Sequence, residues 1–289
     1  MTDILDGHIH LRGGEPAPEA YLVEMAAAGV SGGALISLPP AAFSRTADEE
    51  TLPSSARLRH LLDWCAPGKN LYPLFWVDPL EPDALEQVAM AVDAGVAGFK
   101  VICNHFSPGH PTALGVFRAI AAAGKPVLFH SGILWDGKPS SEYCRPAGFE
   151  ALLGVPGLRF TLAHIGWPWC DEMIAVYGKF LNALGHGQSG VEMFIDITPG
   201  TPPIYRRRAL TDLFQTGYDV ADNVIFGSDC AAPGYNAPWT EEWLRRDEEI
   251  LTDIGVGQDV LDKVRAGNLR RFLGLSGERV ERTIPRPAV

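Results

Sequence analysis

Short apolar runs alternate with helix-like segments along almost the whole chain. Eight of the runs are expected to be strands, and several are apolar throughout, which is typical of parallel strands buried on both faces. They span residues 3–10, 33–38, 71–77, 97–102, 126–130, 158–164, 191–197 and 223–228. Helical patterns occupy residues 18–28, 53–65, 82–94, 113–123, 147–153, 171–184, 204–216, 241–254 and 258–273. Eight strands alternating with helices predict an α/β protein with a (β/α)8 barrel, or TIM barrel, whereas a flavodoxin-like sheet needs only about five strands.

The chain length also suits one large barrel, because α/β barrels of more than 250 residues commonly form a single domain. Of the 289 residues, 46% are hydrophobic and 20% are charged, a balance that supplies a sizeable core and excludes disorder as the main state. We therefore expect one barrel domain over residues 1–289, with a C-terminal helix at about 258–273.

The charge and the cysteine pattern narrow the partners and the compartment. Lys and Arg number 24 against 35 Asp and Glu, so the net charge is −11 and binding to nucleic acid or anionic lipid is not expected. The five cysteines are widely spaced and form no CxxC pair, which argues against a disulfide framework or a zinc ribbon. The N-terminus does not resemble a signal peptide, and no apolar run approaches the ~20 residues of a membrane span. We expect a soluble cytoplasmic protein.

The strongest local signal is a pair of histidines at the end of the first predicted strand. His8 and His10 are two residues apart, so both side chains project from the same face of the strand. Two adjacent imidazoles suit a borderline metal ion such as zinc. A pair of hydrogen-bonded interior histidines would give the same pattern, and this pair alone does not separate the two interpretations.

Three more polar residues close apolar runs in the same way. His130 ends the fifth predicted strand, His164 ends the sixth, and Asp229 follows the eighth. The carboxyl ends of barrel strands are where barrel enzymes hold their active sites. The 34 residues from His130 to His164 are close to one βα unit, which averages 289/8 or about 36 residues. Four imidazoles and a carboxylate are thus predicted to meet at one mouth of the barrel.

With these residues the sequence resembles the amidohydrolase superfamily. It looks most like the amidohydrolase-related branch that includes aminocarboxymuconate-semialdehyde decarboxylase and many small metal-dependent hydrolases. The segments that carry the resemblance are Asp6–Leu11, Gly98–Lys100, His130–Gly132, Leu162–Trp169, Phe226–Asp229 and Gly267–Gly274. They cover nearly the whole chain, and their combination is specific although each one alone is not.

The resemblance implies a divalent metal ion, usually zinc with manganese as the alternative, held by His8, His10, His130 and Asp229. It implies that His164 is an acid/base group beside the metal or, in dinuclear relatives, a ligand of a second metal. In dinuclear relatives a lysine on the strand of Lys100 is carboxylated and bridges two metals, whereas in the decarboxylase-like branch the Gly-x-Lys sequence is common without that role. We expect one metal per chain, with Lys100 uncarboxylated and in contact with either the substrate or a metal ligand.

Other residues are candidates for the substrate side of the site. Arg12 follows His10 in a string similar to that of dihydroorotases, in which the arginine holds a substrate carboxylate; a solvated loop arginine is an equal alternative. His105, Trp135 and Trp167 are placed in loops after strands and are expected to line the pocket; a surface position is the alternative for His105, and a packing role is the alternative for Trp167. Tyr235 and Trp239 are expected either to cover the site or to lie at a homodimer interface. The basic run at Arg206, Arg207 and Arg208 is expected to form a solvated helix face.

The predicted function is hydrolysis of a small ester, lactone, amide or cyclic carboxylic acid. A bound metal brings the pKa of its water from 15.7 towards about 7, and Asp229 would accept the proton of that water while His164 polarises the carbonyl or carries a proton. The partner is then a small-molecule substrate, expected to carry a carboxylate. A non-oxidative decarboxylase of an unsaturated or aromatic acid would use the same ligands. A non-catalytic binding or scaffold barrel is the alternative of another class, and the complete ligand set argues against it.

Overall fold

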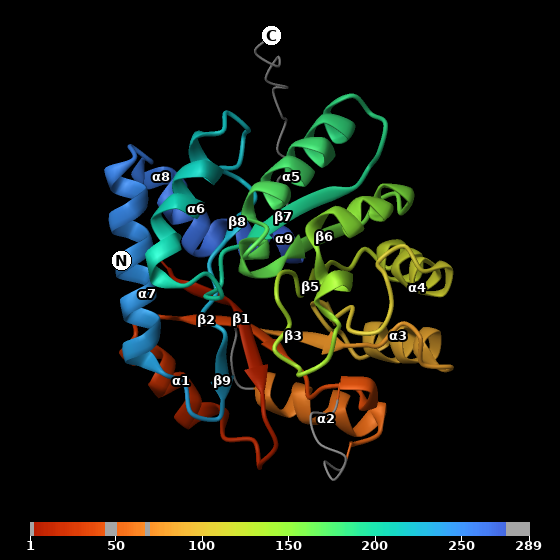
Figure 1. Cartoon of the computed structure of the whole chain (residues 1–289). Helices are drawn as coiled ribbons and strands as arrows, with labels where there is room; N and C mark the ends of the chain where they lie inside the picture. The colour runs from red at the N-terminus through yellow and green to blue at the C-terminus, as the bar shows by residue number, and fades with distance from the viewer. Residues whose placement is uncertain (1–2, 44–50, 67–69, 276–289) are drawn as a thin grey trace.

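The computed structural model describes residues 3–43, 51–66 and 70–275, and its strands form one parallel sheet that curls around a central axis (Figure 1). Neighbours in the sheet follow the chain order from β1 to β8, as in a TIM barrel. The strands are β1 Leu5–Leu11, β2 Gly32–Ile36, β3 Leu71–Trp76, β4 Gly98–Val101, β5 Val127–Phe129, β6 Arg159–Leu162, β7 Glu192–Asp196, β8 Val224–Ile225 and β9 Cys230–Ala232. The eight predicted strands are present in the predicted order, but the eighth continues beyond its predicted end at residue 228 as a separate piece, β9.

The division of the eighth strand closes the ring. Its first part, β8, pairs with β7, and its second part, β9, pairs with β1. Between the two parts, Gly7 N donates to Phe226 O at 2.9 Å and Asp229 N donates to His8 O at 3.0 Å. Asp229 adopts the left-handed region with φ 59°, which interrupts regular strand geometry. The segment from β8 to β9 therefore joins the first and last strands and turns at the mouth.

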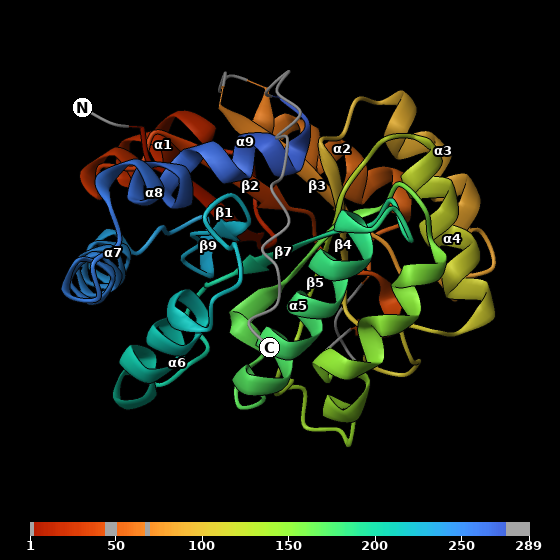
Figure 2. The same ribbon diagram turned by 90° about the horizontal axis from the view of Figure 1, so that it is seen from above.

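The helices surround the sheet and cover its outer face (Figure 2). They are α1 Pro18–Ala27, α2 Ser54–Cys65, α3 Ala84–Asp93, α4 Pro111–Ala122, α5 Cys170–Gly185, α6 Pro203–Gln215, α7 Ala237–Asp253, α8 Gln258–Asp262 and α9 Asn268–Leu273. Pro18 and Pro111 each occupy the first helical turn, where a missing N–H costs nothing. No helix in the described ranges is long and apolar enough to cross a membrane.

Two predicted helices take other geometries. The segment at 147–153 is a 3-10 helix over Pro146–Gly154, and the C-terminal helix is interrupted by a π turn at Lys263–Gly267 between α8 and α9. The short 3-10 helices η1 Ala41–Phe43, η2 Ser141–Cys144 and η4 Ala163–Gly166 lie in the loops that follow strands. These loops form the rim of the mouth.

The basic run at the start of α6 is not wholly solvated, so its predicted exposure is wrong at one position. Arg206 is 0% exposed and makes a two-point contact with the buried carboxylate of Asp247 on α7, at 2.8 and 2.5 Å. The same guanidinium donates to Ile197 O at 2.5 Å. Arg206 therefore joins α6 and α7 to the end of β7, while Arg207 and Arg208 remain exposed and pair at the surface.

Candidate metal centre

His8 is the most constrained of the predicted ligands. Its side chain is fully buried on β1, and Nδ1 lies 2.7 Å from Asp196 Oδ2 at the end of β7. Burial, with Lys100 and His164 nearby, holds the pKa of His8 well below its usual range, so the ring is neutral. A neutral imidazole that donates from Nδ1 to a carboxylate presents the lone pair of Nε2 in the opposite direction. This is the arrangement by which proteins orient a metal-ligating histidine.

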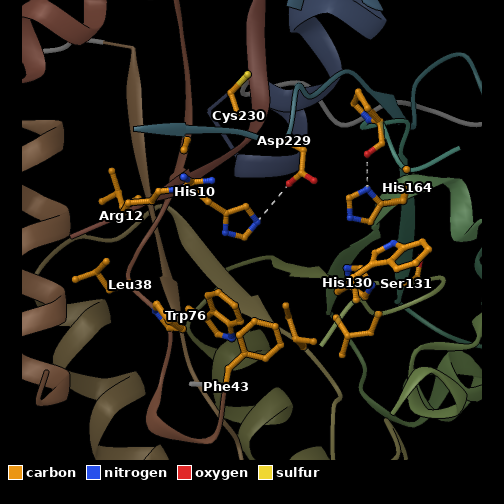
Figure 3. Close-up of a pocket in the computed structure, with 18 of the residues that line it drawn as sticks. His10, Arg12, Leu38, Phe43, Trp76, His130, Ser131, His164, Asp229 and Cys230 are labelled. Carbon is orange, nitrogen blue, oxygen red and sulfur yellow. Dashed lines mark hydrogen bonds and ion pairs between the residues drawn. The ribbon is translucent and has the colours of Figure 1, made fainter. Parts of the chain in front are cut away.

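Three donor atoms, one each from His8, His10 and Asp229, meet at the mouth. His10 Nε2 lies 3.5 Å from Asp229 Oδ1, the contact dashed in Figure 3, and 3.1 Å from His8 Nε2. Asp229 Oδ1 lies 3.7 Å from His8 Nε2. In a tetrahedral zinc site with bonds of 2.0–2.1 Å, neighbouring ligand atoms are about 3.4 Å apart. The spacing of the three atoms matches that edge length. The residues present therefore fit a divalent ion of the size of zinc.

The backbone of Asp229 aims its carboxylate at this point. The left-handed turn at Asp229 is a conformation that Asp tolerates better than most residues. Gly227, two residues before Asp229, is required by close packing, because a Cβ there would lie 2.3 Å from Thr198 Oγ1 and 2.8 Å from His8 Cβ. The chain thus passes close to β1 before Asp229 turns into the mouth.

His164 stands across the mouth from His10. It lies in η4 just after β6, and its Nδ1 donates to Pro199 O at 3.2 Å, which leaves Nε2 for a substrate or an ion. Burial is the main cause that lowers the pKa of His164 to about 4, so this imidazole is also neutral. Ligand atoms of His8, His164 and Asp229 all lie within 4.8 Å of one another. His164 is therefore near enough to act on a group bound at the three donor atoms.

The structure places the last predicted ligand, His130, at the edge of the cluster. Its ring centroid is 4.9 Å from that of His164, but its Nε2 faces Ile133 O at 3.2 Å. Lys100 on β4 is fully buried and extends to within 3.4 Å of His8 Nε2. Burial lowers the pKa of Lys100 to about 8. The roles of His130 as a ligand and of Lys100 as an uncarboxylated neighbour stay predictions.

Two buried carboxylates that support the cluster were not predicted as functional. Asp196 holds His8 and also accepts from Thr198 N at 2.6 Å. Asp6 accepts hydrogen bonds from His8 N at 3.0 Å, Ser228 N at 2.9 Å and Tyr235 OH at 2.8 Å, as well as from Ser228 Oγ. Burial raises the pKa of Asp6 to about 6. Asp6 thus ties β1 to the turn that carries Asp229.

A cavity of about 570 Å³ opens above the donor atoms. Arg12, Trp135 and Trp167, which the sequence predicts on the substrate side, all line it. His105 is not part of the lining; it is 40% exposed and lies 3.5 Å from Asp78.

The expected place of Tyr235 over the site or at an interface is wrong, because the side chain is 6% exposed and hydrogen-bonded to Asp6. Trp239 is 41% exposed, and its indole N–H donates to Ser228 O.

Comparisons with solved structures agree with this fold. The 2,6-dihydroxybenzoate decarboxylase from Rhizobium is 15% identical over 95% of this chain and 99% of its own, with a TM-score of 0.64. A probable 2-pyrone-4,6-dicarboxylic acid hydrolase from Acinetobacter baumannii is 12% identical, covers 94% and 99%, and has a TM-score of 0.61. An amidohydrolase from Burkholderia multivorans with bound zinc is 12% identical, covers 95% and 100%, and has a TM-score of 0.64. At these identities the likeness concerns the fold.

The sequence itself decides the family. A search of curated proteins found no significant match. The family model described as amidohydrolase, in contrast, matches residues 5–275, which include every strand and all of the candidate ligands. The chain therefore belongs to the amidohydrolase family of enzymes.

Proposed function

We propose that this protein is a metal-dependent hydrolase of a small ester, lactone, amide or cyclic carboxylic acid, with one zinc ion per chain and manganese as the alternative. The observation that carries the proposal is the spacing of 3.1, 3.5 and 3.7 Å among His8 Nε2, His10 Nε2 and Asp229 Oδ1. Hydrogen bonds to buried acceptors fix the rings of His8 and His164 before any ligand binds.

A divalent ion at these atoms would supply a Lewis acid and a nucleophilic water near neutral pH. The proton transfers of the reaction are assigned to two residues of the chain. Asp229 is placed to accept the proton of the attacking water, because its carboxylate is 39% exposed and faces the cavity. His164 is neutral, so Nε2 can take a proton or accept a hydrogen bond during the reaction.

The substrate-side residues add charge to this site. In this proposal Arg12, at the rim, binds a carboxylate of the substrate. The buried Lys100 amine, 3.4 Å from His8 Nε2, adds a positive charge beside the position of the ion. Trp135 and Trp167 cover the bound molecule from the loops after β5 and β6. We further propose a cytoplasmic enzyme that binds small molecules, with neither a nucleic acid nor a membrane as partner; a homodimer is compatible with this role.

Decarboxylation is a second candidate function of the same site. The observation that favours it is the presence of Trp76 and Phe43 in the cavity lining, where an unsaturated or aromatic acid would stack. Both reactions use the same ligands, but only decarboxylation releases carbon dioxide.

The test is a screen of the zinc-loaded protein against lactones, amides, esters and unsaturated carboxylic acids, with acid release and carbon dioxide measured in parallel. Hydrolysis without carbon dioxide supports the first candidate, and carbon dioxide release supports the second. Asp229→Asn is expected to lower turnover at least ~10²-fold, because asparagine cannot take a proton from water. His186→Asn, an exposed change at the end of α5, serves as the control. A variant Asp229→Asn with full activity would remove the proposed base.

A further inference from the structure

The cavity above the donor atoms has two unlike walls. Nitrogen and oxygen ligands occupy one side, and apolar side chains occupy the other (Figure 3). In the figure, Trp76 and Phe43 lie opposite Asp229 and point into the same space. Ile133, Trp135 and Trp167 also line the cavity, and we define the apolar wall as Leu38, Phe43, Trp76, Ile102 and Leu134. These residues come from four different βα loops or strand ends, so the wall is a feature of the barrel mouth as a whole.

Trp76 is the fixed centre of the apolar wall. It ends β3, its side chain is 4% exposed, and its backbone is held by Ser37 Oγ at 2.9 Å and by Arg57 Nη1 at 2.8 Å. The indole centroid is 4.8 Å from the Phe43 ring and 5.8 Å from the imidazole of His10. A molecule that reaches His10 with its reacting group must therefore place the adjoining atoms against an aromatic surface.

The chemistry of this wall selects against polar substrates. The five side chains that define the apolar wall offer one hydrogen-bonding atom, the indole Nε1 of Trp76, because the other four side chains are hydrocarbon. Hydroxyl groups pressed against it would lose their water without gaining a partner, and such losses are severe in enzyme sites. An apolar ring in the same place gains from leaving water and from ring contacts with Trp76 and Phe43.

We propose that the substrate carries an apolar, ring-sized group next to the reacting carbonyl, and that Trp76 and Phe43 hold this group and exclude polyhydroxylated substrates. The inference rests on the proposed function, because an ion at His8, His10 and Asp229 sets where the carbonyl binds. It goes further in naming the side of the molecule that the enzyme recognises and the two residues that recognise it.

Hydroxamates test the inference without turnover, because they bind metal ions through one common group. Zinc content of the protein is measured first. Affinities of the zinc-loaded protein for acetohydroxamate, benzohydroxamate and gluconohydroxamate are then measured by titration calorimetry. Beside the same metal-binding group, acetohydroxamate carries a methyl group, benzohydroxamate an apolar ring and gluconohydroxamate a chain of hydroxyls. We expect benzohydroxamate to bind at least about tenfold more tightly than either of the others, since each buried methylene contributes measurably to affinity.

Variants assign the preference to its residues. In Trp76→Ala and in Phe43→Ala, the preference for benzohydroxamate over acetohydroxamate should fall at least about threefold. Trp169→Ala changes a half-buried tryptophan outside the cavity lining and should keep the preference. If Trp76→Ala does not fold, Phe43→Ala decides, because Phe43 is half-buried at the rim.

Each remaining outcome overturns the inference. Equal binding of the three compounds, tighter binding of gluconohydroxamate, or an unchanged preference in both cavity variants would show that no apolar group is recognised at this wall. A protein that holds no zinc and binds no hydroxamate would overturn the proposed function and this inference together. A protein that holds zinc and binds all three alike would overturn the inference alone.

Discussion

Asp196 Oδ2 accepts a hydrogen bond from His8 Nδ1 at 2.7 Å, and both side chains are buried within the barrel. The contact joins β7 to β1 across the mouth and leaves one nitrogen of His8 for an ion. Burial raises the pKa of Asp196, and the hydrogen bonds from Thr198 are among the contacts that oppose this rise. The orientation of the most buried ligand therefore depends on a carboxylate that does not itself reach the donor cluster.

Removal of this carboxylate should weaken metal binding. We expect Asp196→Ala to lower zinc affinity ~10- to 100-fold, since partners of ligating histidines commonly contribute this much. Competition with a chromogenic chelator measures the affinity directly. Asp253→Ala, an exposed carboxylate on α7, should leave it unchanged. Equal zinc affinity of Asp196→Ala and the unchanged protein would show that the His8 ring needs no fixed partner.

The hydrogen bond from Tyr235 to Asp6 provides a second test, with a matched control beside it. Tyr235→Phe removes one donor from the carboxylate that holds His8 and Ser228, and should weaken zinc binding several-fold and stability by about 1–2 kcal/mol. Tyr21 packs edge-on against Tyr235 at 5.7 Å, and its buried hydroxyl has no hydrogen-bond partner among the described residues. Tyr21→Phe should therefore be neutral or stabilising. The same zinc affinity in both variants would contradict a positioning role for Asp6.

The sequence predicts the barrel and most of its mouth for a simple reason. Parallel strands buried on both faces appear as apolar runs, and a polar residue at the end of such a run stands out. His164 and Asp229 were found by this rule and His8 by its two-residue spacing from His10, and the side chains of His8, His164 and Asp229 do converge. Asp196 ends an apolar run in the same way, so the signal for it was present and was overlooked.

Other features have no local signal. The partner of Arg206 is Asp247, which lies 41 residues away on another helix, so a run of three arginines gives no indication that the first is buried. Tyr235 belongs to a loop, and its contact with Asp6 spans 229 residues. The second part of the eighth strand was missed because Asp229 turns into the left-handed region between the two parts. Such features depend on tertiary packing, which single-sequence patterns do not contain.

The buried pair of Arg206 and Asp247 should matter much more than a surface pair on the same helices. Arg206→Met leaves the carboxylate of Asp247 buried without its partner, so we expect a loss of about 3–5 kcal/mol in the free energy of unfolding. Arg207→Ala breaks the exposed pair with Asp253 and should cost no more than about 1 kcal/mol. Urea titrations of the two variants give both values. Equal losses would mean that Asp247 is stabilised by something other than Arg206.

Cys170 gives a pH-dependent prediction remote from the donor atoms. Burial is the main cause that raises the pKa of its thiol to about 11, so the reactive thiolate is scarce near neutral pH. Alkylation of Cys170 by iodoacetamide, followed by peptide mass mapping, should be about tenfold slower at pH 8 than in the unfolded chain, because the greater nucleophilicity of a high-pKa thiolate offsets part of the effect. The rate should still be rising between pH 9 and pH 10. A plateau near pH 9 would mean that burial does not raise this pKa.

The metal content of the purified protein tests the central claim most directly. Protein prepared without chelators and analysed by inductively coupled plasma mass spectrometry should contain one divalent ion per chain. That ion should be lost in His8→Ala and His10→Ala, because their Nε2 atoms are 3.1 Å apart at the same point, and it should be retained in His164→Asn. Two ions per chain, with one lost in His164→Asn, would indicate a dinuclear site. No bound ion, and no rise in melting temperature on adding zinc, would contradict the account.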